Sequence, residues 1–275
     1  MRFYCTLSDK NYLKQGSALV RSLKKVSSEK FKIFYLCLDA ETYEAVSKYD
    51  EVEAIHLEEV EKSRREIVEY KNKKQYNEYC WSLASTFSRY LLDQGIDSVM
   101  YVDSDIYFYQ DPEIIYKELG QKSIGIIRHR HNTSSSPDGE FNVGIIFFRN
   151  DEDGKSCVKW WNDCLLNGDR PDLATCGDQK YLEEFPKKWD TAILDETFAH
   201  GAPWNYRLYV YDNLFTDGTV VWGDKTQPLV FNHFSRFSID HPTSGHYADH
   251  TLNYQIFNMP AVNYLYRHYA EELSK

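Results

Sequence analysis

Short apolar runs alternate with amphipathic stretches along the N-terminal part of the chain. Residues 3–7 and 31–38 are dominated by apolar, β-prone side chains, which predicts two buried strands. A shorter run of the same kind covers residues 52–57. The segments between these runs, 13–26 and 40–49, repeat their apolar residues at the spacing of one helix face. A strand–helix–strand–helix–strand opening is typical of a mainly parallel sheet.

The remainder of the chain continues this alternation, with less regularity toward its end. Residues 58–77 are densely charged, which predicts an exposed helical excursion with a solvated surface. Residues 189–221 predict irregular structure with short strands, and the helix expected over residues 254–273 is interrupted near Pro260. No repeat or linker divides the chain, so we expect one domain with a C-terminal elaboration. The other expected strands cover 98–108, 123–128, 141–150 and 228–234, and the other expected helices cover 76–92, 112–119, 151–166 and 178–185.

Two carboxylates follow the apolar run at residues 98–102. Asp103 and Asp105 stand two positions apart, where the predicted strand delivers them to its carboxyl end. In open α/β sheets, ligands bind at that end of the strands. Two close carboxylates repel each other, and a divalent cation that carries a phosphate-bearing substrate would offset their charge. The alternative is a solvated acidic turn, which the preceding buried strand makes less favourable.

Composition and charge narrow the classes of partner and compartment. The 275 residues are 42% hydrophobic and 27% charged, as is usual for a soluble globular protein. The net charge of −10 argues against a nucleic-acid partner, because no basic excess is present to meet phosphates. No apolar stretch reaches the length of a transmembrane segment, and no signal peptide is evident, so we expect a cytoplasmic location. Six cysteines without a CxxC pair predict free thiols in a reducing compartment, at Cys5, Cys37, Cys80, Cys157, Cys164 and Cys176.

Four stretches together resemble the GT-A-fold glycosyltransferases, and glycosyltransferase family 8 most closely. Residues 6–12 are similar to the nucleotide-binding opening of that family, and residues 101–105 to its DxD motif behind an apolar strand. The third stretch is Phe141-Asn142-Val143-Gly144, similar to the FNxG strand. The fourth comprises Gly177-Asp178-Gln179 and the late histidine strand that ends at His233 and Phe234. The chain departs from the family after His233, where a Gly- and Lys-containing loop ending in Pro-Trp is absent and Arg236 is a candidate substitute for the lysine.

The resemblance implies an α/β fold of the GT-A, Rossmann-like type, with a mainly parallel mixed sheet flanked by helices. Residues 1–240 would form the glycosyltransferase domain, and residues 241–275 its C-terminal helical elaboration. The implied metal ligands are Asp103, Asp105 and His233, which as two carboxylates and one imidazole suit Mn²⁺, with Mg²⁺ as the alternative. The implied nucleotide-sugar-binding residues are Thr6, Asp9, Tyr12, Arg89, Asp103, Ser104, Asn142 and Gly144, with Arg89 paired to a DxD carboxylate or a donor-sugar oxygen.

The resemblance also implies a reaction. A hexose would move from a nucleotide-diphosphate sugar, with UDP as the expected nucleotide, to a saccharide or glycolipid acceptor, with retention of configuration. Surface polysaccharide or lipopolysaccharide synthesis is the expected setting, with weak peripheral contact at the inner face of the membrane as an option. The implied catalytic residues are Asp178 and Gln179. Asp178 is the nucleophile if a covalent intermediate forms; otherwise the acceptor attacks on the leaving-group face while Gln179 stabilises the cation-like centre.

Other interpretations compete with this one. Phosphatases of the haloacid dehalogenase type also place DxD after a strand, but near the N-terminus and with a later acidic motif, which this chain lacks. A non-catalytic carbohydrate- or nucleotide-binding protein would not need the metal pair. We expect solvated loop positions for five histidines whose spacing fits no metal signature: His129, His131, His241, His246 and His250. Stacking on an acceptor sugar and core packing are equally consistent with three aromatic residues: Trp204, Tyr206 and Trp222.

Overall fold

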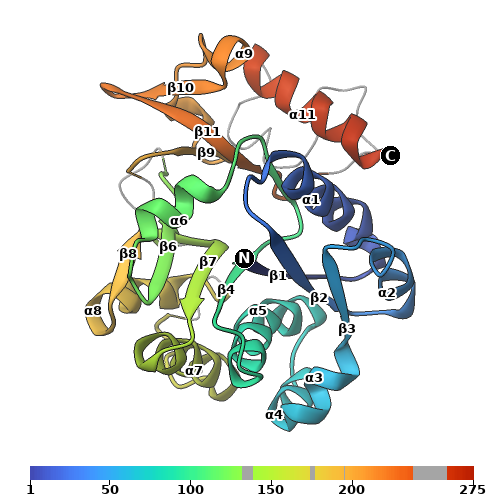
Figure 1. Ribbon diagram of the computed structural model, residues 1–275. Helices are drawn as coiled ribbons and strands as arrows, with labels where there is room; N and C mark the ends of the chain where they lie inside the picture. The colour runs from blue at the N-terminus through green and yellow to red at the C-terminus, as the bar shows by residue number, and fades with distance from the viewer. Residues whose placement is uncertain (132–138, 174–176, 195, 238–258) are drawn as a thin grey trace.

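A seven-stranded mixed sheet forms the centre of the protein, with the strand order β3-β2-β1-β4-β7-β6-β8 (Figure 1). The computed structural model describes residues 1–131, 139–173, 177–194, 196–237 and 259–275. β1 pairs in parallel with β2 and β4, and β7 runs antiparallel to β4 and β6. The expected α/β fold with a mainly parallel mixed sheet is therefore confirmed. The strands are β1 (Arg2–Ser8), β2 (Phe31–Cys37), β3 (Val52–His56), β4 (Ser98–Val102), β6 (Ile124–Arg128), β7 (Phe141–Arg149) and β8 (Thr191–Ile193).

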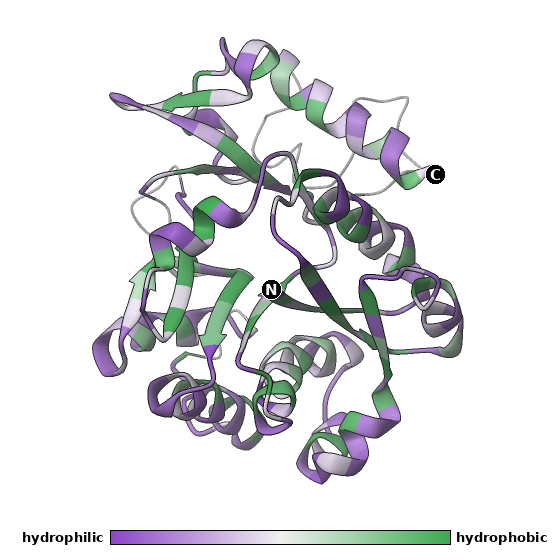
Figure 2. Ribbon diagram, in the orientation of Figure 1, coloured by the Kyte–Doolittle hydropathy of each residue, from purple (hydrophilic) through white to green (hydrophobic). Residues whose placement is uncertain are grey.

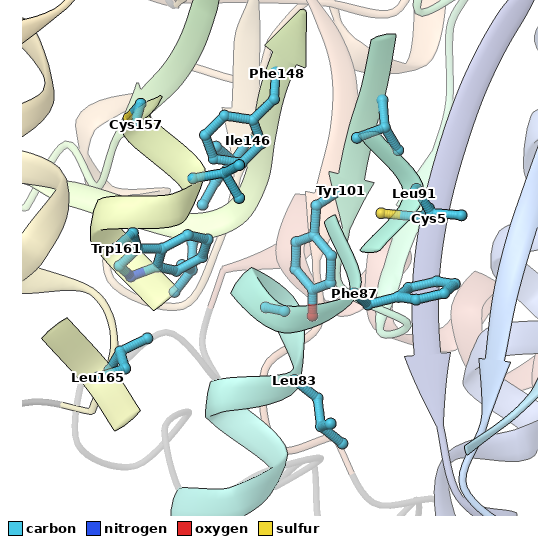
Figure 3. Close-up of a cluster of buried hydrophobic side chains, with 14 of the residues drawn as sticks. Cys5, Leu83, Phe87, Leu91, Tyr101, Ile146, Phe148, Cys157, Trp161 and Leu165 are labelled. Carbon is cyan, nitrogen blue, oxygen red and sulfur yellow. The ribbon is translucent and has the colours of Figure 1, made fainter. Parts of the chain in front are cut away.

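Helices cover both faces of this sheet because successive strand residues point to opposite sides. Tyr4 and Ile33 pack on one face, beneath α1, α2 and α6. Cys5 and Phe34 pack on the other face, where aromatic and aliphatic residues of α5 and α7 close the core (Figure 3). The helices of the first face are α1 (Leu13–Val26), α2 (Ala40–Val46) and α6 (Glu113–Leu119); those of the second are α3 (Leu57–Ser63), α4 (Arg65–Lys71), α5 (Tyr76–Asp93) and α7 (Glu152–Asn167).

The charged stretch at residues 58–77 is helical, as expected, but it is more than a solvated surface. It forms α3, α4 and the start of α5, and Val60 and Ile67 are fully buried against the core. Hydropathy along the ribbon shows the same division, with hydrophobic strands inside and hydrophilic residues on outward helix surfaces (Figure 2). The helix expected at residues 178–185 is instead two short helices, η3 (Lys180–Glu184) and α8 (Phe185–Lys188).

A second, smaller sheet meets the main one at the acidic pair. The stretch 98–108, expected to be one strand, is two: β4 ends at Val102, and β5 (Ile106–Phe108) joins the second sheet. The intervening turn is closed by the Ile106 amide, which donates to the Asp103 carbonyl at 3.1 Å. Asp103 and Asp105 therefore lie where the chain crosses between the sheets. The other strands of the second sheet are β9 (Ala199–Gly201), β10 (Thr219–Trp222) and β11 (Lys225–His233).

The C-terminal helix α11 (Pro260–Leu273) packs beside α1 and the small sheet (Figure 1). Tyr269 stacks on Phe234 with 3.9 Å between ring centroids, and Arg21 of α1 donates to the Glu272 carbonyl at 2.5 Å. The helix begins at Pro260, where we expected an interruption. The predicted division at residue 240 falls within 238–258, outside the described residues. Among the described helices, none has both the length and the apolar character that crossing a bilayer requires.

Candidate active site

The two carboxylates and the late histidine converge at the junction of the two sheets. β11 pairs antiparallel with β5 so that His233 stands opposite Ile106, which brings its imidazole beside Asp105. His233 Nε2 lies 3.1 Å from Asp105 Oδ1 and 3.7 Å from Asp103 Oδ2. One possible ligand atom from each residue lies within 4.8 Å of the others. Two carboxylate oxygens and one imidazole nitrogen at this separation fit a single divalent cation such as Mn²⁺.

The charges of this cluster show why a cation suits it. Burial raises the pKa of Asp103, His233 opposes that shift, and Asp105 adds to it. The Tyr101 hydroxyl donates to Asp103 Oδ1 at 2.8 Å and holds the carboxylate in place. Burial alone would lower the pKa of His233, but Asp105 and Asp103 raise it above its ordinary value. The carboxylates thus need a positive neighbour, and a bound divalent cation would supply that charge.

Gly144 joins this cluster to a group of side-chain amides. Its carbonyl accepts from the Asp103 amide at 2.9 Å, and its own N–H donates to Asn142 Oδ1 at 2.8 Å. A Cβ at this position would lie 2.5 Å from Asn142 Oδ1 and 2.8 Å from His233 Nδ1, so only glycine fits. Because Gly144 fixes the oxygen of Asn142, the amide nitrogen points away and donates to Gln179 Oε1 at 2.9 Å. Asn142 and Gln179 are therefore held together beside the carboxylates.

Asp178 is a buried carboxyl group close to the same cluster. Its residue is only 6% exposed, and the Trp161 indole donates to its backbone carbonyl at 3.1 Å. Burial raises the pKa of Asp178 well above its usual range, and the negative charge of Asp103 adds to this shift. η3 begins after Gln179, whose side chain forms no capping hydrogen bond with the described residues. The described contacts therefore give Asp178 no helix-capping role that would account for its burial.

The first strand and the turn after it lie near the acidic pair. Asp9 accepts from the amides of Asn11 and Tyr12 at 2.9 and 3.3 Å, which closes the turn into η1 (Lys10–Tyr12). The Tyr76 hydroxyl also donates to Asp9, at 3.1 Å. Tyr12 is 41% exposed, and its pKa is raised by burial of its hydroxyl and by the charges of Asp105, Asp103 and Asp9. An exposed aromatic ring thus lies close to the proposed cation ligands.

The hydroxyl of Thr6, at the carboxyl end of β1, is completely buried. It has no hydrogen-bond partner among the residues that the structure describes. Ser104, between the two carboxylates, is also buried. A buried hydroxyl without a partner costs about 1–3 kcal/mol, so a polar ligand that reached Thr6 would recover that free energy.

Comparison with known proteins decides the family of this chain. Residues 32–259 match the family model described as nucleotide-diphospho-sugar transferase. The chain belongs to this family. It is 30% identical over 255 residues to the uncharacterized protein YfnF of Bacillus subtilis strain 168, covering 86% of this chain and 82% of that protein.

Two solved structures confirm the GT-A fold of this glycosyltransferase. One is the galactosyltransferase LgtC in complex with donor and acceptor sugar analogs, at a TM-score of 0.61 and 13% identity, covering 99% of this chain and 95% of that chain. The other is apo mouse xyloside xylosyltransferase 1, at a TM-score of 0.58 and 14% identity, covering 85% and 97%. The expected relationship to GT-A glycosyltransferases is thus confirmed, and it replaces the phosphatase and the non-catalytic alternatives.

Arg89 of this glycosyltransferase does not pair with the acidic motif, so the first of its two expected contacts is wrong, whereas the second, to a donor-sugar oxygen, stays a prediction. Its guanidinium donates to Asp163 Oδ1 at 2.7 Å and to Asn162 Oδ1 at 3.1 Å, both on α7. The Asn162 amide in turn donates to the hydroxyls of Ser85 and Thr86. The polar surface of α5 therefore packs against α7 and is not directed toward Asp103 and Asp105.

His129 is buried against Asn142 and Gln179, whereas we expected a solvated loop residue. It is buried at the end of β6, and its Nε2 lies 3.1 Å from Gln179 Oε1 and 3.2 Å from Asn142 Nδ2. Its ring stacks on His131 with 4.5 Å between centroids. The signal in the sequence is its position directly after a strand, at the sheet edge where Asn142 also lies. The later histidines of that prediction, His241, His246 and His250, lie outside the described residues.

The three aromatic residues for which sugar stacking and core packing were equally consistent have different environments in the structure. Tyr206 is fully buried, and its hydroxyl donates to Asn232 at 2.8 Å, which is core packing. Trp222 covers the Arg130 guanidinium at 3.9 Å. Trp204 lies against His233 and His129, next to the proposed cation ligands.

Proposed function

We propose that this glycosyltransferase moves a hexose from a UDP-sugar to a saccharide or lipid-linked acceptor, with retention of configuration. The observation that carries the proposal is the chain of hydrogen bonds through Gly144. It links Asp103 of the acidic cluster to Asn142 and, through Asn142, to Gln179. Groups suited to a diphosphate-bound cation and groups suited to sugar hydroxyls thus occur side by side.

Asp103, Asp105 and His233 would hold the cation, and Mn²⁺ suits their mixed oxygen and nitrogen donors better than Mg²⁺. The bound cation supplies Lewis-acid stabilisation of the negative charge that develops on the leaving diphosphate. Tyr101 keeps Asp103 oriented through its hydrogen bond. The carboxylates in this proposal bind the leaving group and do not attack the sugar.

The turn after β1 would bind the nucleoside. Tyr12 offers an exposed ring on which a base can stack, and Asp9 is held rigidly enough to accept from a base or ribose group. Thr6 supports this assignment because its buried hydroxyl has no partner within the described part of the chain. Ser104 would contact the ribose, and Arg236, which is exposed and whose charge acts on Tyr12, would approach the diphosphate.

Asn142, Asp178 and Gln179 would surround the transferred hexose. Amide and carboxyl groups in fixed orientations match hydroxyls by directional hydrogen bonds. Burial makes the Asp178 carboxylate costly, so a positively charged sugar centre would stabilise it. The two retaining routes then use the same residues: Asp178 attacks the anomeric carbon, or the acceptor attacks from the leaving-group face while Gln179 stabilises the centre.

The acceptor and the cellular setting are the broadest part of the proposal. A surface polysaccharide or lipopolysaccharide precursor is the acceptor class that the family resemblance supports. Synthesis of such precursors would place the protein in the cytoplasm, with weak contact at the inner face of the membrane.

A thermal-shift experiment tests the proposal. UDP or GDP at one hundred times its Kd, with Mn²⁺, should stabilise the protein by about 2.7 kcal/mol. Manganese alone and UDP with EDTA are the controls, and both should give smaller shifts. Release of UDP from UDP-glucose or UDP-galactose then tests the donor. Absence of any nucleotide-dependent shift, together with absence of UDP release from either donor, would contradict the proposal.

A further inference from the structure

Trp204 lies in the loop between β9 and η4 (Tyr206–Leu208), and this loop is fastened to the site. The Asn205 amide donates to the His129 carbonyl at 3.2 Å, and Asn205 Oδ1 accepts from the Ala202 amide at 2.8 Å. Both bonds are within the buried interior. The loop therefore holds the indole of Trp204 in a fixed position relative to His129.

The indole is placed between the two halves of the site. Its ring meets the His233 imidazole at 5.3 Å between centroids, with 82° between the planes. It meets the His129 ring at 5.4 Å and 76°. His233 belongs to the proposed cation site, and His129 contacts Gln179. Trp204 thus lies where the leaving group and the transferred sugar would meet.

The indole N–H of Trp204 is buried and differs in its hydrogen bonding from that of the other buried tryptophan, Trp161. The residue is 9% exposed, and Nε1 has no hydrogen-bond acceptor among the described residues. Trp161, the fully buried tryptophan, instead donates its indole N–H to the Asp178 carbonyl. Burying an unpaired donor costs about 1–3 kcal/mol, which favours an acceptor that arrives with a ligand. A sugar hydroxyl is an acceptor of this kind, and sugars also pack against aromatic rings.

We propose that Trp204 is a sugar-binding residue whose indole N–H donates to a hexose hydroxyl at the reacting centre. The proposal rests on the function proposed above. The hydroxyl belongs either to the transferred hexose or to the acceptor beside it. A substrate analogue that lacks this hydroxyl would leave a buried donor unpaired, so Trp204 would contribute to the choice of sugar.

Trp204→Phe tests the proposal because phenylalanine keeps an aromatic ring and removes the N–H. Trp189→Phe, in a cluster with Phe185 and Trp160, is the matched control. Both variants are compared with the wild type for UDP affinity with Mn²⁺, hydrolysis of UDP-glucose and UDP-galactose, and transfer to a panel of saccharides. UDP affinity should change less than twofold in either variant, because UDP carries no hexose for the indole to contact. For a substrate that does carry the hexose, loss of one neutral hydrogen bond should weaken binding roughly tenfold.

The hydrolysis and transfer assays show whether the hydroxyl belongs to the transferred hexose or to the acceptor. A roughly tenfold rise in KM for hydrolysis in Trp204→Phe alone assigns the contact to the transferred hexose. Unchanged hydrolysis with a similar loss of transfer assigns it to the acceptor. Wild-type values in both assays would overturn the proposal. If the wild type neither binds UDP nor releases it from a donor, the proposed function itself fails.

A second measurement uses the wild-type protein alone, so its outcome does not depend on whether a variant folds. The indole N–H resonances of wild-type protein labelled with nitrogen-15 are recorded with UDP and Mg²⁺, then with UDP-glucose or UDP-galactose, and then with added saccharides. Formation of the bond should move one indole resonance downfield when a hexose is present and leave it in place with UDP alone. No sugar-dependent movement of any indole resonance would overturn the proposal.

Discussion

Two largely buried polar regions of this protein differ in whether their polar groups find hydrogen-bond and ion-pair partners within the protein. Between α5 and α7, Arg89 is paired with Asp163, and Asn162 bonds to Ser85 and Thr86. At the sheet junction, the carboxyl groups of Asp103, Asp105 and Asp178 lie close together, and His233 is the imidazole beside Asp103 and Asp105. The buried donors of Thr6 and Trp204 have no partner among the described residues.

The difference separates groups that stabilise the fold from groups arranged for a ligand. Buried polar groups are normally paired within the protein, because an unpaired one costs free energy. Arg89 and Asn162 at the helix interface follow this rule. Thr6 and Trp204 depart from it among the described residues, and under the proposed function a ligand with a cation, phosphates and hydroxyls would supply partners for them and for the carboxyl groups. Substitutions in the two regions should therefore have opposite effects on activity and on stability.

The largest expected effect is that of Asp105→Asn on turnover. The change removes a charged cation ligand, and the charge stabilisation contributed by a bound metal is worth several kcal/mol, or roughly a thousandfold in rate. Initial rates across a Mn²⁺ titration measure it. The melting temperature should stay near that of the wild type. Full metal-dependent turnover in this variant would exclude Asp105 as a ligand.

The next effect in size is that of Asp178→Asn, which should act on activity and stability in opposite directions. Turnover should fall about a hundredfold, as when one precisely placed electrostatic group is lost, while UDP affinity changes little. The neutral amide removes the cost of a buried carboxyl whose pKa is raised, so the melting temperature should be equal or higher. Calorimetry with UDP and a melting curve test both. Equal losses of turnover and UDP affinity would make Asp178 a nucleotide contact.

The smallest effect on turnover is expected from Arg89→Met. The change leaves Asp163 with Lys159 as its remaining cationic partner, so the loss should be about 1 kcal/mol of the free energy of unfolding after allowance for solvent. Turnover per folded molecule should match the wild type, because Arg89 contacts α7. Asp163→Asn is the matched control; it leaves Arg89 with amide oxygens as acceptors and should cost a similar amount of stability. Loss of activity in a folded Arg89→Met protein would show that Arg89 contributes to substrate binding or catalysis.

Local patterns predicted the sheet but not the division of the acidic stretch. Apolar residues continue from Ser98–Val102 into Ile106–Phe108, so the composition reads as one strand. The change of sheet depends on pairing with β11, more than a hundred positions later. The same long-range pairing brings His233 to Asp105. The family resemblance, and not the local pattern, supplied that partner.

Two expectations, the pairing of Arg89 with the acidic motif and the solvent exposure of His129, differ from the structure for physical reasons of the same kind. The resemblance implied a contact between Arg89 and a DxD carboxylate, but the sequence of α5 does not say which element covers the surface that carries Arg89. Polar composition predicted a solvated loop at His129, yet the residue directly follows β6 and is buried beside Asn142. Both residues lie where tertiary contacts, absent from a local pattern, determine the environment.

Titration calorimetry of UDP tests the central claim most directly, because it asks whether the junction binds a nucleotide diphosphate together with a cation. We predict that UDP binds the wild type in the presence of Mn²⁺, and that EDTA or Asp105→Asn abolishes measurable binding while Asp163→Asn leaves it unchanged. Equal UDP affinity with Mn²⁺ and with EDTA, or no binding under either condition, would contradict the account.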